Sequence, residues 1–391
     1  MRVRTYIYII LLTGYFIGSC KVHRTVKTPA AITSDTTHVK SPDSTRISRE
    51  FVIQDSVEIG IYRIFPDTVT ITGVGDIMLG TNYPDSGYLP EDSGKYLLSN
   101  VADILRSTNL TFGNLEGVLL DDGGTPKNCR NPQKCYLFRM PPYMAGNLHQ
   151  AGFDVLSVAN NHSGDFGPEG RRSTSRILDS LQIHYAGFDS KPYTIFKKDG
   201  IIYGFAAFAP NKGTASLNDL DSARKIILYL DSLADIVLVS FHGGAEGKDH
   251  QHVTRETETF YGENRGNVYV FAHTLIDSGA DIIFGHGPHV VRAVEVYKSR
   301  FIAYSLGNFC TYKRFNLRGE NAYAPIIRVY TDHTGKFLEG KIISAIQTGL
   351  GIPVIDPESR AIKKIIALTE SDFPEAKIFI GDSGVITYIQ K

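Results

Sequence analysis

Residues 235–244, DIVLVSFHGG, form a continuous run of apolar and β-branched residues that ends in a histidine and two glycines. Similar runs occur at TVTITGVG (68–75), NLTFGN (109–114), DVLSVAN (154–160) and DIIFGHG (281–287). Because apolar residues take consecutive positions in these runs, we expect strands that are covered on both faces. Segments with helical spacing separate the runs, such as KYLLSNVADILRS (95–107), and this order is typical of βαβ units in a mostly parallel sheet.

Other segments predict antiparallel strands. Residues 193–208, YTIFKKDGIIYGFAAF, read as a hairpin around Asp199-Gly200, and residues 293–309, AVEVYKSRFIAYSLGNF, have a similar pattern. From residue 323 to residue 391, apolar and polar residues alternate, which indicates further antiparallel strands that close one side. The expected fold class is therefore α/β, a layered sandwich that also contains antiparallel strands.

Size and charge limit the classes of function. The chain has 391 residues with 42% apolar content, enough for one large core or two modest ones. Lysine plus arginine and aspartate plus glutamate both count 41, so no overall field favours nucleic acid or an anionic membrane. We expect no nucleic-acid partner, and the identity of other partners has to come from a site.

The N-terminus has the features of a bacterial secretory signal. Arg2 and Arg4 precede an apolar run over residues 6–17, and Gly18-Ser19-Cys20 follows as a lipobox. The run is shorter than the about 20 residues that a spanning helix requires. We therefore expect residues 1–19 to be removed and a lipid on Cys20 to anchor the exported protein to the cell envelope. A cleaved signal without lipid is the alternative.

The segment after the signal is expected to be a tether. One third of residues 21–50 are Ser or Thr, and the segment has no apolar period. We place a flexible tether at residues 20–66, the main domain at residues 67–320, and an antiparallel C-terminal extension packed on the same domain at residues 321–391.

Export also bears on the cysteines. Cys129 and Cys135 in CRNPQKC are expected to form a disulfide in an oxidising space, around an Asn-Pro turn. A metal-binding pair is the alternative, although no further cysteine or histidine stands nearby. Cys310 follows an apolar stretch and is expected to be buried and inert.

Polar side chains follow each of the apolar runs. These residues are Asp76, Asn114 with Glu116, Asn161 with His162, His242, and His286 with His289. In α/β sheets, ligands bind in the crevice outside the carboxyl ends of the strands, so we expect a shared site there. Carboxylate and amide oxygens together with imidazoles suit a divalent transition metal, one ion or two. No cysteine set accompanies them, which disfavours a structural zinc site.

Six motifs in order carry a family resemblance. They are GVGDIMLG (73–80), GNLEGVLL (113–120), ANNHSGDFG (159–167), SFHGGAE (240–246), GADIIFGHGPHVVRAVEVY (279–297) and AYSLGNF (303–309). The chain resembles the CapA family of poly-γ-glutamate capsule synthesis proteins over residues 69–310, and that family is similar to the calcineurin-like metallophosphoesterases. The resemblance implies a layered α-β-β-α sandwich of mixed sheets and a centre of one or two Mn, Fe or Zn ions that clamps a phosphoester.

The resemblance also implies roles for individual residues. The implied metal ligands are Asp76, Glu116, Asn161, His242, His286 and His289. Asn114 occupies the usual place of the bridging ligand, but a bridge between two dications needs an anion, so Glu116 is expected there. His162 is expected to donate a hydrogen bond or proton to the substrate, and Asp165 to orient its imidazole. Asn160 is expected to brace the turn.

The candidate substrate-binding residues are Arg292, just past His289, and Asn308 in AYSLGNF. For both, a purely structural role is the alternative. Glu246 is expected either to brace His242 or to be solvated.

One departure separates this chain from the superfamily pattern. A histidine usually stands two residues after the first aspartate, and Met78 takes that place here. A thioether is a poor ligand for hard dications, so one metal is expected to be undercoordinated, weakly held or absent.

Two functions follow from these expectations. The first is a lipid-anchored, metal-dependent hydrolase or transferase of the calcineurin-like type that acts on an anionic envelope polymer or a phosphoester. The alternative is a non-catalytic assembly lipoprotein whose metal-lined cleft binds polyglutamate.

Overall fold

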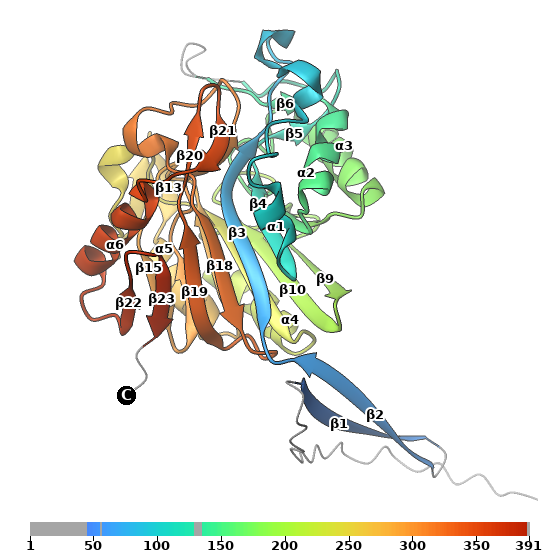
Figure 1. Cartoon of the computed structure of the whole chain (residues 1–391). Coiled ribbons are helices and arrows are strands. Elements are labelled where there is room, and N and C mark those ends of the chain that lie inside the picture. The colour runs from blue at the N-terminus through green and yellow to red at the C-terminus, as the bar shows by residue number, and fades with distance from the viewer. Residues whose placement is uncertain (1–44, 55–56, 129–134, 389–391) are drawn as a thin grey trace, which may run out of the picture.

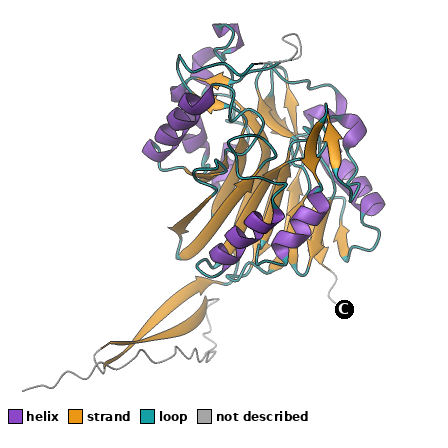
Figure 2. Cartoon of the chain, turned by 180° about the vertical axis from the view of Figure 1, so that it is seen from behind, coloured by secondary structure: helices purple, strands orange, loops and turns teal. Residues whose placement is uncertain are grey.

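Two mixed β-sheets lie face to face in the computed structural model, which describes residues 45–54, 57–128 and 135–388, with side chains from residue 65 on. Helices cover the outer sides of both sheets (Figure 1, Figure 2). The predicted α/β fold, a layered α-β-β-α sandwich of mixed sheets, is confirmed. Within the described ranges, no helix combines the length and the apolar character needed to cross a membrane.

Sheet I contains the strands predicted at residues 68–75, 109–114 and 154–160. Its order is β22-β23-β19-β18-β3-β4-β7-β8, and β17 also pairs with β3. The bounds are β3 Val69–Met78, β4 Leu110–Leu115, β7 Val155–Ser157, β8 His184–Ala186, β17 Asn308–Thr311, β18 Ile326–Thr331, β19 Phe337–Ile343, β22 Ile378–Ile380 and β23 Val385–Tyr388. Strands β3, β4, β7 and β8 run parallel, whereas β18, β19, β23 and β22 extend the sheet in antiparallel fashion.

Sheet II contains the strands predicted at residues 235–244 and 281–287. Its order is β15-β16-β14-β11-β10-β9. The bounds are β9 Tyr193–Lys198, β10 Ile201–Phe208, β11 Ile236–His242, β14 Ile282–His286, β15 Val294–Tyr297 and β16 Arg300–Ala303. Both predicted hairpins are confirmed, since β9 pairs antiparallel with β10 and β15 with β16. Asp199 and Gly200 both have positive φ, as the predicted tight turn requires.

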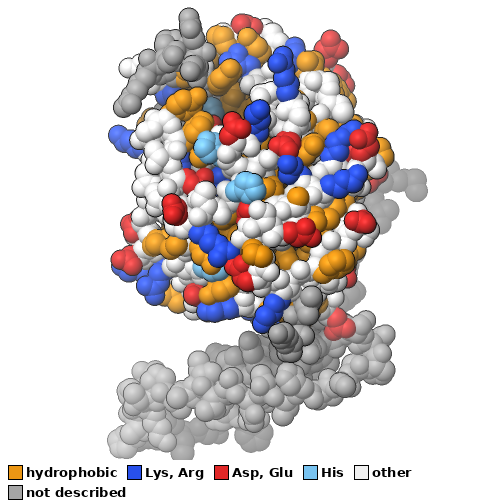
Figure 3. Space-filling view, turned by 90° about the vertical axis from the view of Figure 1, so that its left-hand side faces the viewer, with side chains coloured by type: hydrophobic (Ala, Val, Ile, Leu, Met, Phe, Trp, Pro, Cys, Tyr) orange, Lys and Arg blue, Asp and Glu red, His pale blue; other side chains and the backbone are white. Residues whose placement is uncertain are grey.

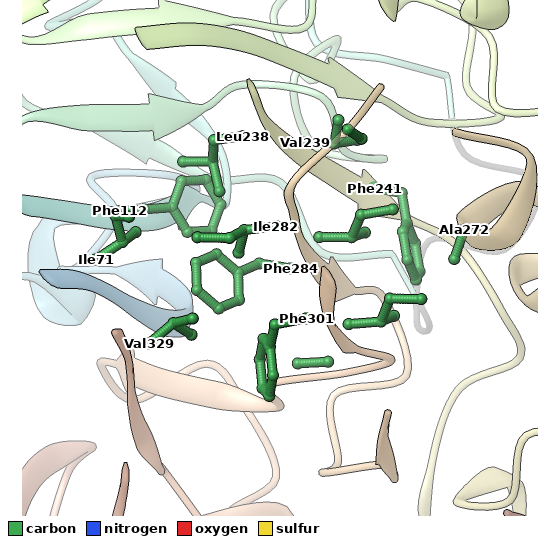
Figure 4. Packing of buried hydrophobic residues seen from close by; sticks show 14 of the residues in the cluster. Ile71, Phe112, Leu238, Val239, Phe241, Ala272, Ile282, Phe284, Phe301 and Val329 are labelled. Carbon is green, nitrogen blue, oxygen red and sulfur yellow. The ribbon is translucent and has the colours of Figure 1, made fainter. Parts of the chain in front are cut away.

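A hydrophobic core fills the space between the sheets (Figure 4). The Phe112 ring of β4 stacks on the Phe284 ring of β14 with centroids 5.4 Å apart. Phe205 of β10 packs against Phe112 at 5.7 Å. These contacts set the spacing of the two sheets directly beneath their carboxyl ends.

The outer layers are helical. Helices α1 (Ala102–Arg106) and α2 (Ala145–Ala151) pack on sheet I, and α3 (Gly167–Ser180) contacts its edge strand β8. Helices α4 (Leu220–Asp231) and α5 (Val268–Ile276) pack on sheet II, and α6 (Arg360–Asp372) contacts β15. The helical segment predicted at 95–107 is regular only over α1, and Ser99 Oγ donates to the Tyr96 carbonyl oxygen 2.8 Å away, a bond that competes with helix formation. Helix α6 lies where the alternating pattern had indicated only strands.

Strand β3 has a divided edge. Its residues up to Val74 pair with β18, and its residues from Asp76 on pair with β17. At the division, Asp76 N donates to the Gly307 carbonyl oxygen at 2.9 Å. A Cβ atom on Gly75 would lie 2.1 Å from that oxygen, so this position admits only glycine without a backbone shift.

Small strand pairs complete the structure. They are β5 (Val118–Leu119) with β6 (Arg139–Met140), β12 (Glu258–Phe260) with β13 (Glu263–Gly266), and β20 (Ala345–Thr348) with β21 (Ile352–Ile355). Strands β1 (Thr45–Gln54) and β2 (Val57–Pro66) form an antiparallel pair within the segment predicted to be a tether. This part of the segment contains many β-branched and aromatic residues, which favour strands. The predicted signal peptide and Cys20 lie outside the described residues.

Candidate metal centre

The carboxyl ends of both sheets present rows of polar side chains. On sheet I, Asp76 is the register partner of Asn114 on β4 and of Asn308 on β17. On sheet II, His242 and His286 are the last residues of β11 and β14 and are register partners of each other. Because the strands in each group are parallel, the fold brings these rows to the same rim of the sandwich.

Asp76 joins the two sheets. Its Oδ1 atom lies 3.1 Å from His286 Nδ1, and its Oδ2 atom lies 2.9 Å from His289 Nδ1. Burial alone would raise the pKa of Asp76, but the hydrogen bonds from the two histidines hold it below its ordinary value. Burial alone would lower the pKa of His289, but the hydrogen bond and the charge of Asp76 raise it to about 9.

Asn114 links the two buried carboxylates. Its Nδ2 atom donates to Asp76 Oδ1 at 2.8 Å and to Glu116 Oε2 at 2.7 Å. The other oxygen of Glu116 lies 3.4 Å from His242 Nε2. Burial, and then the nearby charge of Asp76, raise the pKa of Glu116 to about 7. The amide therefore holds Glu116, the residue expected as the bridging anion, beside Asp76.

Glu116, His242 and His289 could hold a metal ion, since their ligand atoms lie within 4.8 Å of one another. Several buried atoms of the predicted ligands have no hydrogen-bond partner in the described part of the chain, and these are Glu116 Oε1, Asn161 Oδ1, both ring nitrogens of His242, and His286 Nε2. Burial, and then the charge of Arg265, lower the pKa of His242 well below its ordinary value, which favours the neutral ligand form. These oxygen and imidazole donors fit a divalent transition metal, since buried polar groups ordinarily have partners.

The loop after β7 presents His162 to this centre. Asp165 Oδ2 lies 2.7 Å from His162 Nδ1, so the carboxylate orients the imidazole. His162 Nε2 then lies 4.0 Å from Glu116 Oε1. Asn160 braces the loop, because its Oδ1 accepts from His162 N at 3.1 Å and its Nδ2 donates to the Leu115 carbonyl oxygen at 2.8 Å.

The segment that precedes β6 also contacts this loop. Lys127 Nζ lies 2.5 Å from Asp165 Oδ1 and donates to the Asn161 carbonyl oxygen at 3.2 Å. Phe138 N donates to Asp165 Oδ2 at 2.7 Å, and the Phe138 ring packs on His162 with centroids 4.2 Å apart. These contacts could not be predicted from the sequence, because Lys127 and Phe138 belong to none of the motifs.

Arg292 does not occupy the predicted place beside the substrate. It is fully buried, and its two terminal nitrogens each lie 2.7 Å from an oxygen of Glu258. Its Nε atom donates to the His250 carbonyl oxygen at 2.9 Å. A guanidinium that is saturated in this way braces the β12 region, so the prediction that it holds a substrate anion does not fit the structure.

Asn308 lies at the centre, but the contacts of its side chain are to His289 and to the backbone of neighbouring loops. Its Oδ1 atom is 3.2 Å from His289 Nδ1, and its Nδ2 donates to the carbonyl oxygens of His289 and Asn321. His289 has a positive φ of 58°, an uncommon conformation for histidine. Asn308 therefore holds His289 in its orientation toward Asp76.

Arg265 is a buried charge that no motif in the sequence indicated. Its Nε atom donates to the Gly244 carbonyl oxygen at 3.0 Å, and its Nη1 atom lies 3.0 Å from Glu246 Oε1. Glu246 thus pairs with Arg265, which was not among the roles expected for it. The position of Arg265 in ENRGN carries no pattern that would have indicated this.

Only one free cysteine lies within the described residues, Cys310 of β17. Cys310 is buried, and burial raises the pKa of its thiol. Cys129 of the predicted disulfide with Cys135 lies outside the described residues.

Fold and site together define a layered α/β sandwich of mixed sheets with a candidate metal centre at the rim of its sheets. The family model for the bacterial capsule synthesis protein PGA_cap matches residues 70–313, and the chain belongs to this family, as the CapA resemblance predicted.

The chain is also similar to individual curated relatives and to a solved structure. The chain is 28% identical over 263 residues to the capsule biosynthesis protein CapA of Bacillus anthracis, covering 62% of this chain and 60% of that protein. It is 30% identical over 260 residues to the PGA biosynthesis protein CapA of Bacillus subtilis (strain 168), covering 62% and 63%. The chain thus spans less than two thirds of the length of these relatives. It is also similar to the 5'-nucleotidase precursor of Thermus thermophilus, with a TM-score of 0.39, 13% identity, and 78% and 58% of the two chains covered.

Proposed function

We propose that this protein is a lipid-anchored, metal-dependent hydrolase or transferase that acts on an anionic envelope polymer or a phosphoester. Its role would be in the synthesis, anchoring or release of a poly-γ-glutamate capsule. The observation that carries the proposal is that buried ligand atoms of Glu116, Asn161, His242 and His286 have no hydrogen-bond partner among the described residues, while Glu116, His242 and His289 form a grouping that could hold an ion. The family and the names of the two Bacillus relatives support the choice of polymer.

One or two Mn, Fe or Zn ions would be held by the residues at the rim. The proposed ligands are Asp76, Glu116, Asn161, His242, His286 and His289. A bound dication supplies Lewis acidity toward a phosphoryl or amide carbonyl oxygen, so both phosphoester and amide cleavage are within reach of the site. Asn114 and Asn308 position Glu116 and His289 through the hydrogen bonds described above.

His162 is the proposed general acid. Its Nδ1 atom contacts the Asp165 carboxylate, which orients the ring and leaves Nε2 to face the centre. From there it can donate a hydrogen bond or a proton to the charge that develops on the substrate. The Phe138 ring packs on the imidazole and limits its rotation.

Membrane attachment through Cys20 and export to the cell envelope are part of the proposal. They rest on the lipobox and on the short apolar run before it. No nucleic-acid partner is proposed, because the charges of the chain balance.

A second function is favoured by Met78. This residue is fully buried, and its sulfur accepts from Gly80 N at 3.3 Å, so the thioether is engaged with backbone at the place where the superfamily usually has a histidine. With fewer ligands, the centre would bind polyglutamate carboxylates without turning them over. The protein would then be a metal-containing assembly lipoprotein.

The deciding experiment uses the protein without residues 1–19, loaded in turn with Mn, Fe or Zn. Aryl phosphate esters and poly-γ-glutamate are offered, and product is measured beside bound metal. Turnover that disappears in His242→Ala supports the enzyme, and the substrate that is lost identifies the reaction. Tight polymer binding without product in the fully loaded protein would favour the assembly role, and absence of stoichiometric metal would sink both.

A further inference from the structure

A groove of about 600 Å³ runs along helix α3, on the side of the molecule opposite α6 (Figure 1). One wall is the α3 side chains from Pro168 to Asp179, and the other is the turn formed by Phe188, Asp189 and Ser190 after β8. Three arginines of α3 line the groove, and they are Arg171, Arg172 and Arg176. Arg172 and Arg176 are exposed, whereas Arg171 is half-buried.

The groove carries an unbalanced positive charge. Across the described ranges, none of the three guanidinium groups has an ion-pair or hydrogen-bond partner. Of the two carboxylates in the groove, Asp179 is already engaged, since it accepts from Tyr185 Oη at 3.2 Å and lies 3.7 Å from Lys191 Nζ. The chain as a whole is neutral, and Figure 3 shows basic and acidic side chains interspersed over the face that it views. The excess of arginine in the groove is thus a local feature.

The groove adjoins the loop that carries His162. A Cβ atom on Gly164 would lie 3.3 Å from Arg171 Nη1, and one on Gly213 would lie 2.9 Å from Arg171 Cζ. Gly164 stands between His162 and Asp165 in the chain, so the Arg171 guanidinium packs against the same loop that presents His162 to the centre. The groove and the His162 loop are therefore neighbours on the molecule.

We infer that the α3 groove binds a polyanion with successive carboxylates. The bound part would be the stretch of the substrate polymer that adjoins the unit reacting at the centre. The inference rests on the proposed function and names the residues that would give it preference for a polymer. Arg172 and Arg176 are one helical turn apart and therefore lie side by side on the helix surface. A guanidinium matches a carboxylate with two parallel hydrogen bonds, which suits a row of free carboxylates along a polymer.

The test compares two sets of substitutions in the full metal-loaded protein. Arg171→Gln/Arg172→Gln/Arg176→Gln removes the groove charge, and Lys197→Gln/Arg224→Gln/Lys225→Gln removes the same charge from β9 and α4. At low salt, the first variant is expected to bind poly-γ-glutamate about tenfold more weakly or worse, with a weaker dependence on salt. The control variant is expected to keep the affinity of the unmodified protein, and both are expected to keep bound metal. Equal affinity in the two variants would overturn the inference.

Two further measurements keep the test decisive. Arg172→Gln/Arg176→Gln changes only exposed side chains, so it replaces the triple variant if that protein does not fold, and it is expected to lose at least about threefold in affinity. Vesicles of phosphatidylglycerol are the second probe, and a variant that loses vesicle binding but keeps polymer binding would replace the inference with a membrane contact. The binding assay does not depend on catalytic activity. An inactive protein would therefore count against the proposed enzyme but would not affect the test of the groove.

Discussion

Asp76 Oδ1 on sheet I lies 3.1 Å from His286 Nδ1 on sheet II, although the two residues are 210 positions apart in the chain. This contact and the one between Asp76 and His289 hold the rims of the two sheets together. The site therefore depends on the packing between the sheets as well as on its own residues.

Replacing His162 should separate catalysis from metal binding. His162→Ala is expected to lower turnover of an aryl phosphate ester by about 100-fold or more, because it removes the proposed general acid. Bound metal, measured by elemental analysis, should not change, because His162 is not a proposed ligand. Loss of the metal in this variant would instead make His162 a ligand.

Replacing Glu116 should remove the metal. Glu116→Gln is expected to weaken metal affinity by about 100-fold or more, since even residues that only support a ligand typically contribute 10-fold or more. Glu295 offers a control, because its carboxylate also contacts a histidine, His273, and its other partner is Tyr304, and neither of these is a proposed ligand. Glu295→Gln should keep the full complement of metal, and a similar loss in both variants would point to general destabilisation.

Metal affinity should rise with pH. The metal-free protein holds a proton on Glu116 below a pKa of about 7 and on His289 below a pKa of about 9. Both protons must leave when an ion binds, so affinity should increase by up to about 100-fold per pH unit below pH 7 and about tenfold per unit from 7 to 9. Calorimetry in two buffers with different ionisation enthalpies counts the released protons. An affinity that is constant from pH 6 to 9 would contradict the assignment of these groups.

Gly75 should tolerate no side chain. Gly75→Ala places a Cβ 2.1 Å from the Gly307 carbonyl oxygen and is expected to lower the free energy of unfolding by about 1–3 kcal/mol or more. Gly146 in α2 is the control, because nothing lies within 4 Å of a Cβ added there. Gly146→Ala should leave stability unchanged or raise it by up to about 1 kcal/mol. Urea denaturation of both variants checks the difference, and equal stability would refute the tight approach at Gly75.

Arg292 should matter for stability. Arg292→Leu leaves Glu258 buried without its partner and is expected to lower the free energy of unfolding by about 3–5 kcal/mol. Arg292→Leu/Glu258→Leu should recover part of this loss, because no unpaired charge remains. If the single variant is as stable as the unmodified protein but has a raised KM, Arg292 binds substrate after all.

The sequence predicted the fold class and the strands that carry the site, because continuous apolar runs and the polar residues that follow them are local features. The convergence of Asp76, Glu116, His242 and His289 followed from the parallel arrangement of these strands. The direction of the Arg292 side chain could not be predicted, since it depends on Glu258, a residue 34 positions away in a segment without a motif. Lys127 and Arg265 were missed for the same reason.

The length of α1 and the presence of α6 were also missed. In the first case a side-chain hydrogen bond at Ser99 competes with the helix, and in the second the apolar residues of Arg360–Asp372 face the core at helical spacing within a tail that otherwise alternates.

The divided edge of β3 has a consequence for the limits of the folding unit. The family model ends at residue 313. Strand β18, which begins at Ile326, nevertheless pairs with the N-terminal part of β3, the strand that carries Asp76. A chain truncated at the family boundary would leave that strand with open backbone donors and acceptors, a surface that promotes self-association. The smallest autonomous piece of this protein therefore has to reach beyond the segment by which its family is recognised.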